Sequence, residues 1–504
     1  MPTVAAETSP YDSVPYPSLA YPETHPDRLA TIGILLGLEA PDVRHCRVLE
    51  IGCGDGSNLL PMAASLPDAE FVGIDLASRP IDRAKSLIER TGSKNVSVVA
   101  LNLLNFDEDF GFFDYIIAHG FYSWVPKIVQ DKLFQVCSNH LTKNGIAFVS
   151  YNTYPAGHIR QISRNLILYH TLKNNIPDEH KVRAGVEILK FMEESADERS
   201  LWKTILHEEC GRISGRSPNA VSHDDLGTDY FSVYFHDFIE QARQYGLQFI
   251  SEAKMADVLD DRIGAEVSEA LDKMSNGDIA AYEQYLDFVL FQGFRRTLLC
   301  HEGIGLDRKN FSDKLKGLWV ASPLRHSRES KDGIVEFSSE WRKGTLQTND
   351  AATIAALLYL EKLWPRGETF PSLLEHASAS LPSEVLDKAA EEFTKNILAL
   401  AGKGAIELRS HPVAVADTIS TRPVASSLAR VQARGQSVVT TILHTQVDLK
   451  DEPTRRCLQL LDGTCDHRKI ANKLVQEYPA LRNSASTQLG ETLRGFCRMG
   501  LLIA

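Results

Sequence analysis

From Arg47 to about residue 151, short apolar runs alternate with longer segments of helical spacing. The runs are nearly continuous, whereas Ile81, Ala84 and Ile88 recur on one face of a helix. Near-continuous apolar strands joined by helices are typical of a parallel sheet that is buried on both faces. We therefore predict an α/β, Rossmann-like doubly wound sheet. Its expected strands are Val48–Gly52, Phe71–Asp75, Val96–Leu101, Tyr115–His119 and Ile146–Tyr151, and its expected helices are Leu59–Leu66, Ile81–Arg90 and Ile128–Leu141.

The pattern changes beyond this region. A helix-rich stretch from about residue 158 to 242 is followed by two further predicted strands, Gly246–Ala253 and Phe294–His301. These strands could complete the sheet, which makes the helices between them an insertion. The order strand, three helices, strand between residues 334 and 413 predicts a winged-helix-like α+β module. We expect domains at 1–46 (with the first helix), 47–304, 334–413 (winged-helix-like) and 420–504 (helical or winged-helix-like), with a linker at 305–333.

The first 26 residues carry Tyr11, Tyr16 and Tyr21 at a five-residue step, interleaved with prolines. Such a segment cannot form a helix or a central strand. One interpretation is a flexible tail, which is common at a terminus. However, three evenly placed rings are a large aromatic surface to leave in water, which favours packing against the domain.

Length and composition narrow the class of protein. A chain of 504 residues is too long for one hydrophobic core, and 43% hydrophobic with 24% charged residues is ordinary for folded domains. No apolar run is long enough to cross a bilayer, and the N-terminus lacks the pattern of a secretion signal. The eight cysteines form no Cys-x-x-Cys pair, which argues against zinc-ribbon or thioredoxin chemistry. We expect a cytoplasmic protein with reduced thiols, and the net charge of −12 disfavours general nucleic-acid binding.

The clearest motif, Glu50-Ile-Gly52-Cys-Gly54-Asp-Gly56, follows the first predicted strand. Its glycines allow a sharp turn and a close approach of a ligand to a helix N-terminus. The third glycine comes one position too early for a dinucleotide fingerprint. The pattern instead resembles motif I of S-adenosyl-L-methionine-dependent methyltransferases, where the loop passes under the methionine and ribose of the cofactor. Glu50 is suited to attract the cofactor's amino group, and the predicted cofactor site here comprises Glu50, Gly52, Cys53, Gly54 and Asn58.

The next two strands extend the same site. Asp75 lies about twenty residues beyond the glycines, where an acid can accept hydrogen bonds from both ribose hydroxyls. Methyltransferases often place an Asp after the third strand to accept from the adenine amino group. This chain has Asn102 there, whose carbonyl can accept the same bond. Leu76 and Leu103 are expected to sandwich the adenine ring.

The fourth and fifth strands end in aromatic residues at the sheet edge where ligands bind. His119, Tyr122 and Trp124 follow the fourth strand, and we assign His119 to the cofactor. The Asn/Asp-Pro-Pro-aromatic motif of base and glutamine methyltransferases is absent there, which disfavours nucleobase methylation. Asn152 and Tyr154 end the fifth strand. Core packing is the alternative for any single ring, but together these residues predict a substrate mouth.

These segments together resemble one bacterial family. The similarity lies in HPDRLA, LEIGCGDGSNLLPMA, HGFYSWVP, SYNTYPAGH, SHDDLGTDYFSVYFHDFIEQARQYGLQFISEA and FRRTLLCH, and covers most of residues 11–304. The family is that of methyltransferases with an attached methyltransferase regulatory domain. It includes protein-lysine methyltransferases that act on bacterial outer-membrane proteins. One departure is that the family often has Pro-Gly-Trp-His after the fifth strand. This chain has Pro155-Ala156-Gly157-His158, which leaves the acceptor preference open.

The resemblance implies a seven-stranded methyltransferase fold over residues 47–304, with a regulatory region at about 158–300. The resemblance also implies that residues 1–46 form a lid over the cofactor, with Tyr16 in the cofactor site. It also places His223 at the active site, with an N-capping or core histidine as the alternative. The expected partner is a protein substrate, an outer-membrane or surface protein before its export. The C-terminal modules are expected to dock that substrate or a second subunit, which leaves a homodimer open.

In-line methyl transfer mainly requires alignment of the acceptor, the methyl group and the sulfur. A lysine acceptor must be held as the neutral amine, by desolvation and by the nearby positive sulfonium. Rings such as Tyr122, Trp124 and Tyr154 could hold the cationic product, and the Asn152 carbonyl could orient the amine. With His223 these form the predicted catalytic set, and no metal is needed.

Two other functions stay open from the residues alone. A small-molecule N- or O-methyltransferase would use the same pocket, although the insertion and the extra modules favour a macromolecular substrate. A regulator could instead use the methyltransferase fold as a sensor and bind DNA through its winged-helix modules. Residues 420–504 carry 12 Lys or Arg against 7 Asp or Glu and are the one credible nucleic-acid surface. Neither nucleic acid nor a membrane is an expected partner.

Overall fold

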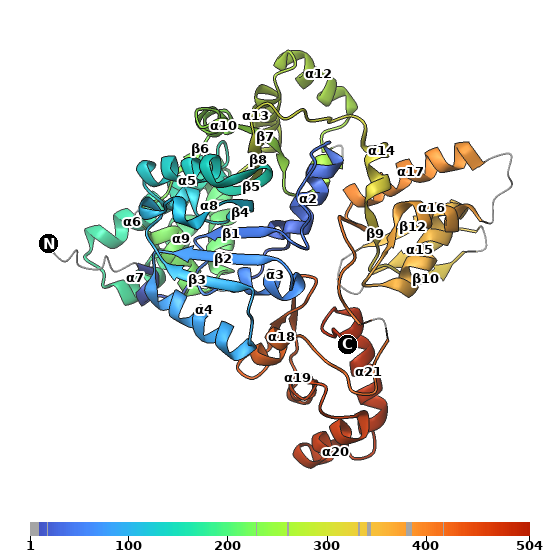
Figure 1. Cartoon of the computed structure of the whole chain (residues 1–504). Coiled ribbons are helices and arrows are strands. Elements are labelled where there is room, and N and C mark those ends of the chain that lie inside the picture. Colours follow the sequence, from blue (N-terminus) through green and yellow to red (C-terminus); the bar gives the residue numbers. More distant parts are fainter. Residues whose placement is uncertain are drawn as a thin grey trace.

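The computed structural model describes residues 10–17, 19–227, 229–259, 262–330, 333–339, 344–379, 386–416 and 418–504. Its main sheet has the order β3-β2-β1-β4-β5-β8-β7 (Figure 1). Strands β1 to β5 are parallel to one another, and short β6 pairs in parallel with the end of β5. Strand β8 is antiparallel to both β5 and β7. The bounds are β1 (Arg47–Ile51), β2 (Glu70–Asp75), β3 (Val96–Ala100), β4 (Phe113–Ala118), β5 (Leu141–Thr153), β6 (Ser232–Val233), β7 (Leu247–Glu252) and β8 (Phe294–His301). All seven predicted strands are present, which confirms the methyltransferase-type sheet.

Alternate residues of each strand enter two separate cores. Val48 of β1 packs into one core, and its neighbour Leu49 packs into the other, as the two-residue period of a strand requires. The first core is covered by α2 (Pro26–Leu35), α3 (Leu59–Ser65) and α4 (Ser78–Thr91), and the second by α5 (Lys127–His140) and α10 (Phe235–Arg243). Because both faces are covered, the central strands β1 and β4 are almost wholly buried, and ligands can reach only the sheet edges.

The predicted insertion is helical. Helices α6 (Gly157–Lys173), α7 (Asp178–Ser195), α8 (Leu201–Ser214) and α9 (Pro218–Leu226) follow β5 and share a small core of their own. Helices α11 (Met255–Leu259), α12 (Ala265–Ser275) and α13 (Ile279–Leu290) lie between β7 and β8. This arrangement brings α6 and α9 to the end of β5, beside the predicted substrate mouth (Figure 1).

The middle module contains α15 (Ala351–Leu363), α16 (Phe370–Ser378) and α17 (Leu386–Gly402), with β11 (Val335–Ser338), β12 (Thr345–Thr348), β13 (Glu368–Thr369) and β14 (Glu407–Arg409). The expected linker at 305–333 is also structured, with α14 (Phe311–Lys314), η5 (Leu315–Gly317), β9 (Trp319–Ala321) and β10 (Arg325–Glu329). Strand β9 is the central strand between β13 and β14, and β10 pairs with β11. Much of the segment 305–333 therefore belongs to the middle module, because the short apolar strand β9 joins β13 and β14 into one sheet.

The C-terminal module consists of α18 (Ser427–Gln432), a hairpin of β15 (Val438–Thr440) and β16 (Gln446–Asp448), then α19 (Glu452–Gln459), α20 (His467–Glu477), η7 (Pro479–Leu481) and α21 (Ala485–Arg498). It has a separate core. Its helix α18 packs against α3 and α4, so the module lies beneath the first half of the main sheet (Figure 1).

The N-terminal segment contains two short turns, α1 (Pro10–Ser13) and η1 (Pro22–Thr24). The prediction that it cannot form any helix was therefore wrong at these turns. A proline at the start of a turn lacks only a donor that would be unpaired there anyway. Within the described part of the chain, no helix combines the length and the apolar character that a membrane span requires.

Candidate active site

The glycine loop after β1 is shaped to leave room for a ligand. Gly52, Gly54 and Gly56 have φ values of +76°, +54° and +74°, in the region that side chains disfavour. A Cβ atom on Gly56 would collide with Leu60, whereas one on Gly54 would meet no atom within 4 Å. The loop therefore packs closely on its helix side at Gly56 and borders open space at Gly54, as a cofactor-binding loop must.

Glu50 lies at the base of this loop and is 4% exposed. Its Oε1 accepts a hydrogen bond of 2.6 Å from Nδ2 of Asn58, and its buried Oε2 has no hydrogen-bond partner among the described residues. Burial raises the pKa of Glu50 to about 8; the Asn58 bond opposes the rise, and the Asp75 and Asp55 charges add to it. A buried, unpartnered carboxylate oxygen is costly unless a cation pairs with it. An amino group of a bound cofactor fits this need.

Asp75 ends β2 directly beside the loop. Its Oδ2 accepts from the Gly54 N–H at 2.9 Å and its Oδ1 from the Ala77 N–H at 2.8 Å. Burial raises its pKa, and these two bonds oppose the rise. Each oxygen keeps a second lone pair, so the fixed carboxylate can still accept from two ribose hydroxyls. Cys53, the remaining loop residue of the predicted site, is buried against Gly73 of β2 and contributes packing.

The adenine side of the predicted site is only partly as expected. Leu76 is 47% exposed, which leaves its side chain available to pack on an adenine ring. Leu103 is buried in the second core. Asn102 uses its Oδ1 to accept from the Leu104 N–H at 3.0 Å, which caps the short helix η2 (Leu103–Asn105). Its carbonyl is therefore already engaged once and has one lone pair left for an adenine amino group.

The N-terminal segment crosses the cofactor side of the sheet. Tyr21 packs on His119, with 3.9 Å between ring centroids, and its N–H donates to Oδ1 of Asn58 at 2.8 Å. Burial, with a smaller contribution from the Arg296 charge, lowers the pKa of His119 to about 3, so its ring is neutral. The Tyr16 hydroxyl donates to Asp224 on α9 at 3.2 Å. The segment thus extends from the glycine loop to the helical insertion.

His223 on α9 is turned towards the N-terminal segment. Its ring stacks on Tyr11, with centroids 4.2 Å apart, and its Nε2 donates to the backbone oxygen of Val14 at 2.7 Å. Of the two alternatives for His223, N-capping does not fit, because it lies in the last turn of α9, whereas its 7% exposure fits a buried histidine. The arrangement makes His223 an anchor for the segment above the cofactor site.

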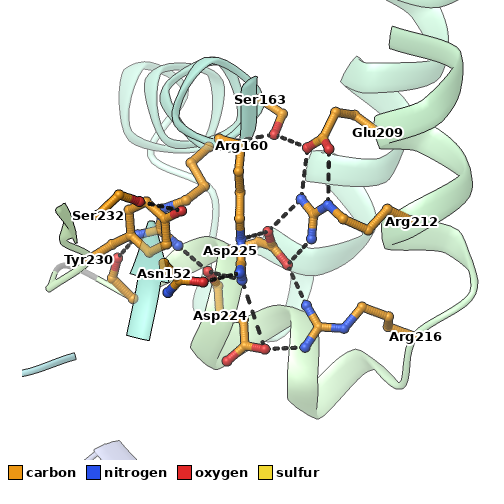
Figure 2. Close-up of polar contacts among 12 residues, drawn as sticks. Asn152, Arg160, Ser163, Glu209, Arg212, Arg216, Asp224, Asp225, Tyr230 and Ser232 are labelled. Carbon is orange, nitrogen blue, oxygen red and sulfur yellow. Dashed lines mark hydrogen bonds and ion pairs between the residues drawn. The ribbon is translucent and has the colours of Figure 1, made fainter. Parts of the chain in front are cut away.

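At the predicted substrate mouth the structure brings together Trp124, Asn152, Arg160 and Tyr230. The Arg160 guanidinium lies 5.5 Å from the Trp124 ring centroid and 5.2 Å from that of Tyr230. Its Nη1 donates to Oδ1 of Asn152 at 3.2 Å, and the buried Nδ2 of Asn152 has no partner in the described ranges. Figure 2 shows Arg160 beside Asn152 and the α9 carboxylates. A side-chain cation therefore already packs against two aromatic rings here, next to an amide.

A charged cluster supports this mouth, and sequence reasoning missed it. Arg212 pairs with Asp225 at 2.9 Å and with Glu209 at 2.8 Å, and Arg216 pairs with Asp224 (Figure 2). Arg164 donates to the backbone oxygens of Asp224 and Gly227. Arg160 and Arg164 are spaced one turn apart on α6, and two adjacent acids follow His223, which were the available signals. The cluster fixes α6 and α9 against each other.

Two further predicted substrate residues lie elsewhere. Tyr122 is 1% exposed, its ring packs on Phe134 and Phe238, and its hydroxyl donates to Oε1 of Gln241 at 2.7 Å. It is a core residue rather than part of the mouth. Tyr154 is half-buried and stacks on His158, with centroids 4.0 Å apart. This pair stands at the rim, separate from the contacts of Trp124 and Arg160.

The predicted site thus contains two carboxyl groups at the glycine loop, Glu50 and Asp75, and an aromatic cluster near the end of β5. The open space at Gly54, the unpartnered Glu50 oxygen and the exposed Leu76 fit a methionine-bearing nucleoside. No group of three or more His, Cys, Asp or Glu suited to a metal ion occurs in the residues that the structure covers.

Comparison with known proteins identifies the same parts. Family models match residues 49–147 ("Methyltransferase domain"), 217–301 ("Predicted methyltransferase regulatory domain") and 421–488 ("PKMT, C-terminal winged helix domain"). An uncharacterized protein of Rickettsia prowazekii is 30% identical over 487 residues, 93% of this chain and 86% of that protein. A second one from the same organism is 40% identical over 235 residues, 46% of this chain and 94% of that protein. The structure of PKMT2 from Rickettsia typhi in complex with AdoHcy is 28% identical, with a TM-score of 0.87 over 97% of this chain and 100% of that one.

Proposed function

Because this chain belongs to the family of S-adenosylmethionine-dependent methyltransferases with a regulatory domain and a PKMT C-terminal winged helix domain, we propose that it methylates lysine side chains of a protein substrate. The expected methyltransferase fold, cofactor and C-terminal winged helix are confirmed by these matches. The winged-helix match lies on residues 421–488, in the second of the two C-terminal modules. The individual site residues and the acceptor are part of the proposal.

When bound, S-adenosylmethionine supplies a methyl group that is already activated for displacement. In the proposed site Glu50 pairs with the cofactor's amino group and Asp75 accepts from the ribose hydroxyls. The N-terminal segment, held by Asn58 and Asp224, excludes water from above. The protein therefore contributes mainly by alignment and by desolvation of the reacting groups.

One observation carries the lysine proposal: the Arg160 guanidinium packs against both Trp124 and Tyr230 and donates to Asn152. A pocket with this chemistry suits a lysine side chain and its methylated, cationic product. Arg160 is held by Asn152 and by ion pairs with Asp224 and Asp225 at 3.9 and 3.8 Å, so we propose that it stays in place during the reaction.

A fixed positive charge at the mouth would also favour the reactive form of the acceptor. A lysine must lose its proton before it can attack, and a nearby cation lowers the pKa of an amine. The neighbouring Arg164 shows that this part of the protein disfavours a second positive charge, because burial and the charge of Arg160 lower its pKa to about 10. We propose that Asn152 then orients the neutral amine and that Trp124 contacts its carbon chain.

From the family resemblance we also propose that the substrate is an outer-membrane or surface protein that is methylated in the cytoplasm before export. A homodimer is a further proposal. Large apolar side chains on α6, α7 and α8 are exposed in the single chain, among them Tyr169, Leu172, Phe191 and Leu201. Exposed apolar side chains of this size can contribute to a protein interface, and light scattering of the purified protein would test for a dimer.

The test uses the purified enzyme, S-adenosylmethionine with a radiolabelled methyl group, and a lysate of its host. A labelled protein band whose tryptic peptides contain methyl-lysine supports the proposal. The Asp75→Ala variant is the control that should transfer no label. Label found only in small molecules, or on a residue other than lysine, would contradict it.

A further inference from the structure

A hairpin of the C-terminal module reaches the cofactor pocket. The turn between β15 and β16 places His444 against Asn58, whose Oδ1 lies 2.9 Å from Nε2 of His444 although the two are 386 positions apart. His444 is 1% exposed, so it is enclosed between the module and the methyltransferase domain. Asn58 also holds Glu50, and the contact therefore lies one side chain away from the carboxylate that we assign to the cofactor's amino group.

The hydrogen-bond directions at Asn58 are determined. Its Oδ1 accepts from the Tyr21 backbone N–H at 2.8 Å, and a backbone N–H can only donate. The same oxygen must accept from His444, so Nε2 of His444 carries the proton. The amide nitrogen of Asn58 is then turned towards Glu50 and donates to Oε1 at 2.6 Å. His444 thus helps to fix which end of the Asn58 amide faces the carboxylate.

The turn that carries His444 is built specifically. His444 has a φ of +57°, a left-handed conformation that is uncommon for residues other than glycine. The Thr441 N–H donates to the Thr445 oxygen at 2.9 Å, and the Ile442 N–H donates to the Gly500 oxygen at 2.9 Å. These bonds tie the turn to itself and to the end of the C-terminal module.

The ring of His444 is kept neutral. Burial lowers its pKa well below the ordinary value, the nearby His25 and Arg28 lower it further, and a backbone hydrogen bond at Tyr21 opposes the fall. With the proton on Nε2, the other nitrogen is bare, and this buried Nδ1 has no hydrogen-bond partner in the described chain. Because leaving a buried nitrogen unpaired is unfavourable, packing of the module alone does not account for a histidine here. The bond to Asn58 gives it a function.

We propose that the C-terminal winged helix module completes the cofactor site and that His444 is a positioning residue for it. His444 holds Asn58, Asn58 holds Oε1 of Glu50, and Oε2 remains directed at the cofactor's amino group. A displacement of the hairpin therefore weakens cofactor binding. The proposal rests on the assignment of Glu50 to the cofactor but not on lysine as the acceptor.

The test is calorimetric binding of S-adenosylhomocysteine to the full chain. His444→Asn suits the left-handed backbone but is too short to reach Asn58, whereas the amide nitrogen of His444→Gln can replace Nε2. Loss of one buried hydrogen bond predicts about tenfold weaker binding for His444→Asn, and His444→Gln should stay within about threefold of wild type. His467→Ala is the matched control, because His467 is exposed on the same module and contacts Ser420. It should bind as wild type does.

A double-mutant cycle separates positioning from general damage. In an Asn58→Ala background the His444→Asn change should cost no further affinity, because the partner is already absent. An additive loss would overturn the proposal, as would wild-type affinity in His444→Asn. Equal unfolding temperatures of the variants without ligand would show that the module is still folded. Failure of lysine methylation would leave these binding results unchanged, so the two proposals can fail separately.

Discussion

The guanidinium of Arg160 lies over the ring of Trp124, 5.5 Å from its centroid, while its Nη1 donates to the Asn152 carbonyl at 3.2 Å. A permanent cation therefore lies beside the place where we expect the acceptor amine to bind. This relationship connects the aromatic rim that the sequence predicts with the charged cluster on α6 and α9. It also determines the pH dependence expected of the reaction.

Arg160→Gln should raise the apparent pKa of the acceptor in the pH profile of kcat/KM. Without the fixed charge the lysine keeps its proton to higher pH, so a shift of one unit would reduce the rate at neutral pH on the order of tenfold. At high pH the variant should approach the wild-type rate. Arg212→Gln, which alters the same cluster away from Trp124, is the control for structural damage. An equal loss of rate at every pH would argue against this role.

Glu50→Gln should remove a proton release that accompanies cofactor binding. Since burial raises the pKa of Glu50 to about 8, most of the ligand-free protein carries this proton at neutral pH. A cationic ligand stabilises the carboxylate, so wild-type affinity should rise with pH, by up to about tenfold per unit, and level off above about pH 8. The variant should bind S-adenosylhomocysteine more weakly and without this slope. Calorimetry in buffers of different ionisation enthalpy measures the released proton.

The same group makes the ligand-free protein less stable as the pH rises. The folded state holds the Glu50 proton up to about pH 8, whereas the unfolded chain releases it near the ordinary value of 4.5. Its contribution to stability is therefore complete below pH 4.5 and is lost as the pH rises towards 8. Saturating cofactor should reduce this trend, and so should Glu50→Gln. Thermal unfolding at a series of pH values is the measurement, and an identical slope in both proteins would contradict the buried acid.

Gly54→Arg and Asp75→Ala should each abolish cofactor binding. The arginine would fill the open space next to Gly54, and the alanine would remove the carboxylate that accepts from Gly54 and Ala77. Calorimetry with S-adenosylhomocysteine is the check, with circular dichroism to confirm folding. Unchanged affinity in either variant would remove these residues from the site.

Trp124→Ala should lower turnover while cofactor affinity stays within about threefold. The ring contacts Tyr230 and Arg160 rather than the glycine loop. Tyr122→Phe is the matched aromatic control. It removes only a buried hydroxyl bonded to Gln241, so it should lower stability by about 1 kcal/mol and leave KM for the substrate unchanged. Equal losses of cofactor affinity and turnover in Trp124→Ala would place that ring in the cofactor pocket or the core.

The sheet and the cofactor loop were predictable because their signals are local. Near-continuous apolar strands, the glycine spacing and Asp75 after β2 each follow from neighbouring residues. Tyr122 was misplaced because a strand-end ring can face the mouth or the core, and only the contacts with Phe238 and Gln241 decide which. The structured segment at 319–321 was missed because three residues carry too little periodicity to identify a strand.

The contact of His444 with Asn58 could not be found from the sequence, and the arginine cluster left only the local spacing of its charges as a signal. The bond between Asn58 and His444 joins residues that are 386 positions apart, and no spacing rule relates them. The ion pairs of Asp224 and Asp225 with Arg160 form only because α6 packs against α9. Such contacts depend on how domains pack, which a single sequence does not reveal.

Asp27, at the start of α2, has a consequence for how the chain can be divided. Its buried carboxylate accepts from the N–H and hydroxyl of Ser410 and contacts His411. Asp27 thus helps to join the middle module to the opening helix of the catalytic half, together with the ion pair between Arg28 and Glu407. A fragment that ends near residue 304 would lack Ser410 and His411, and the buried Asp27 carboxylate would lose these partners. Experiments that seek a minimal active enzyme should therefore keep the segment with Ser410 and His411 or replace Asp27 with asparagine.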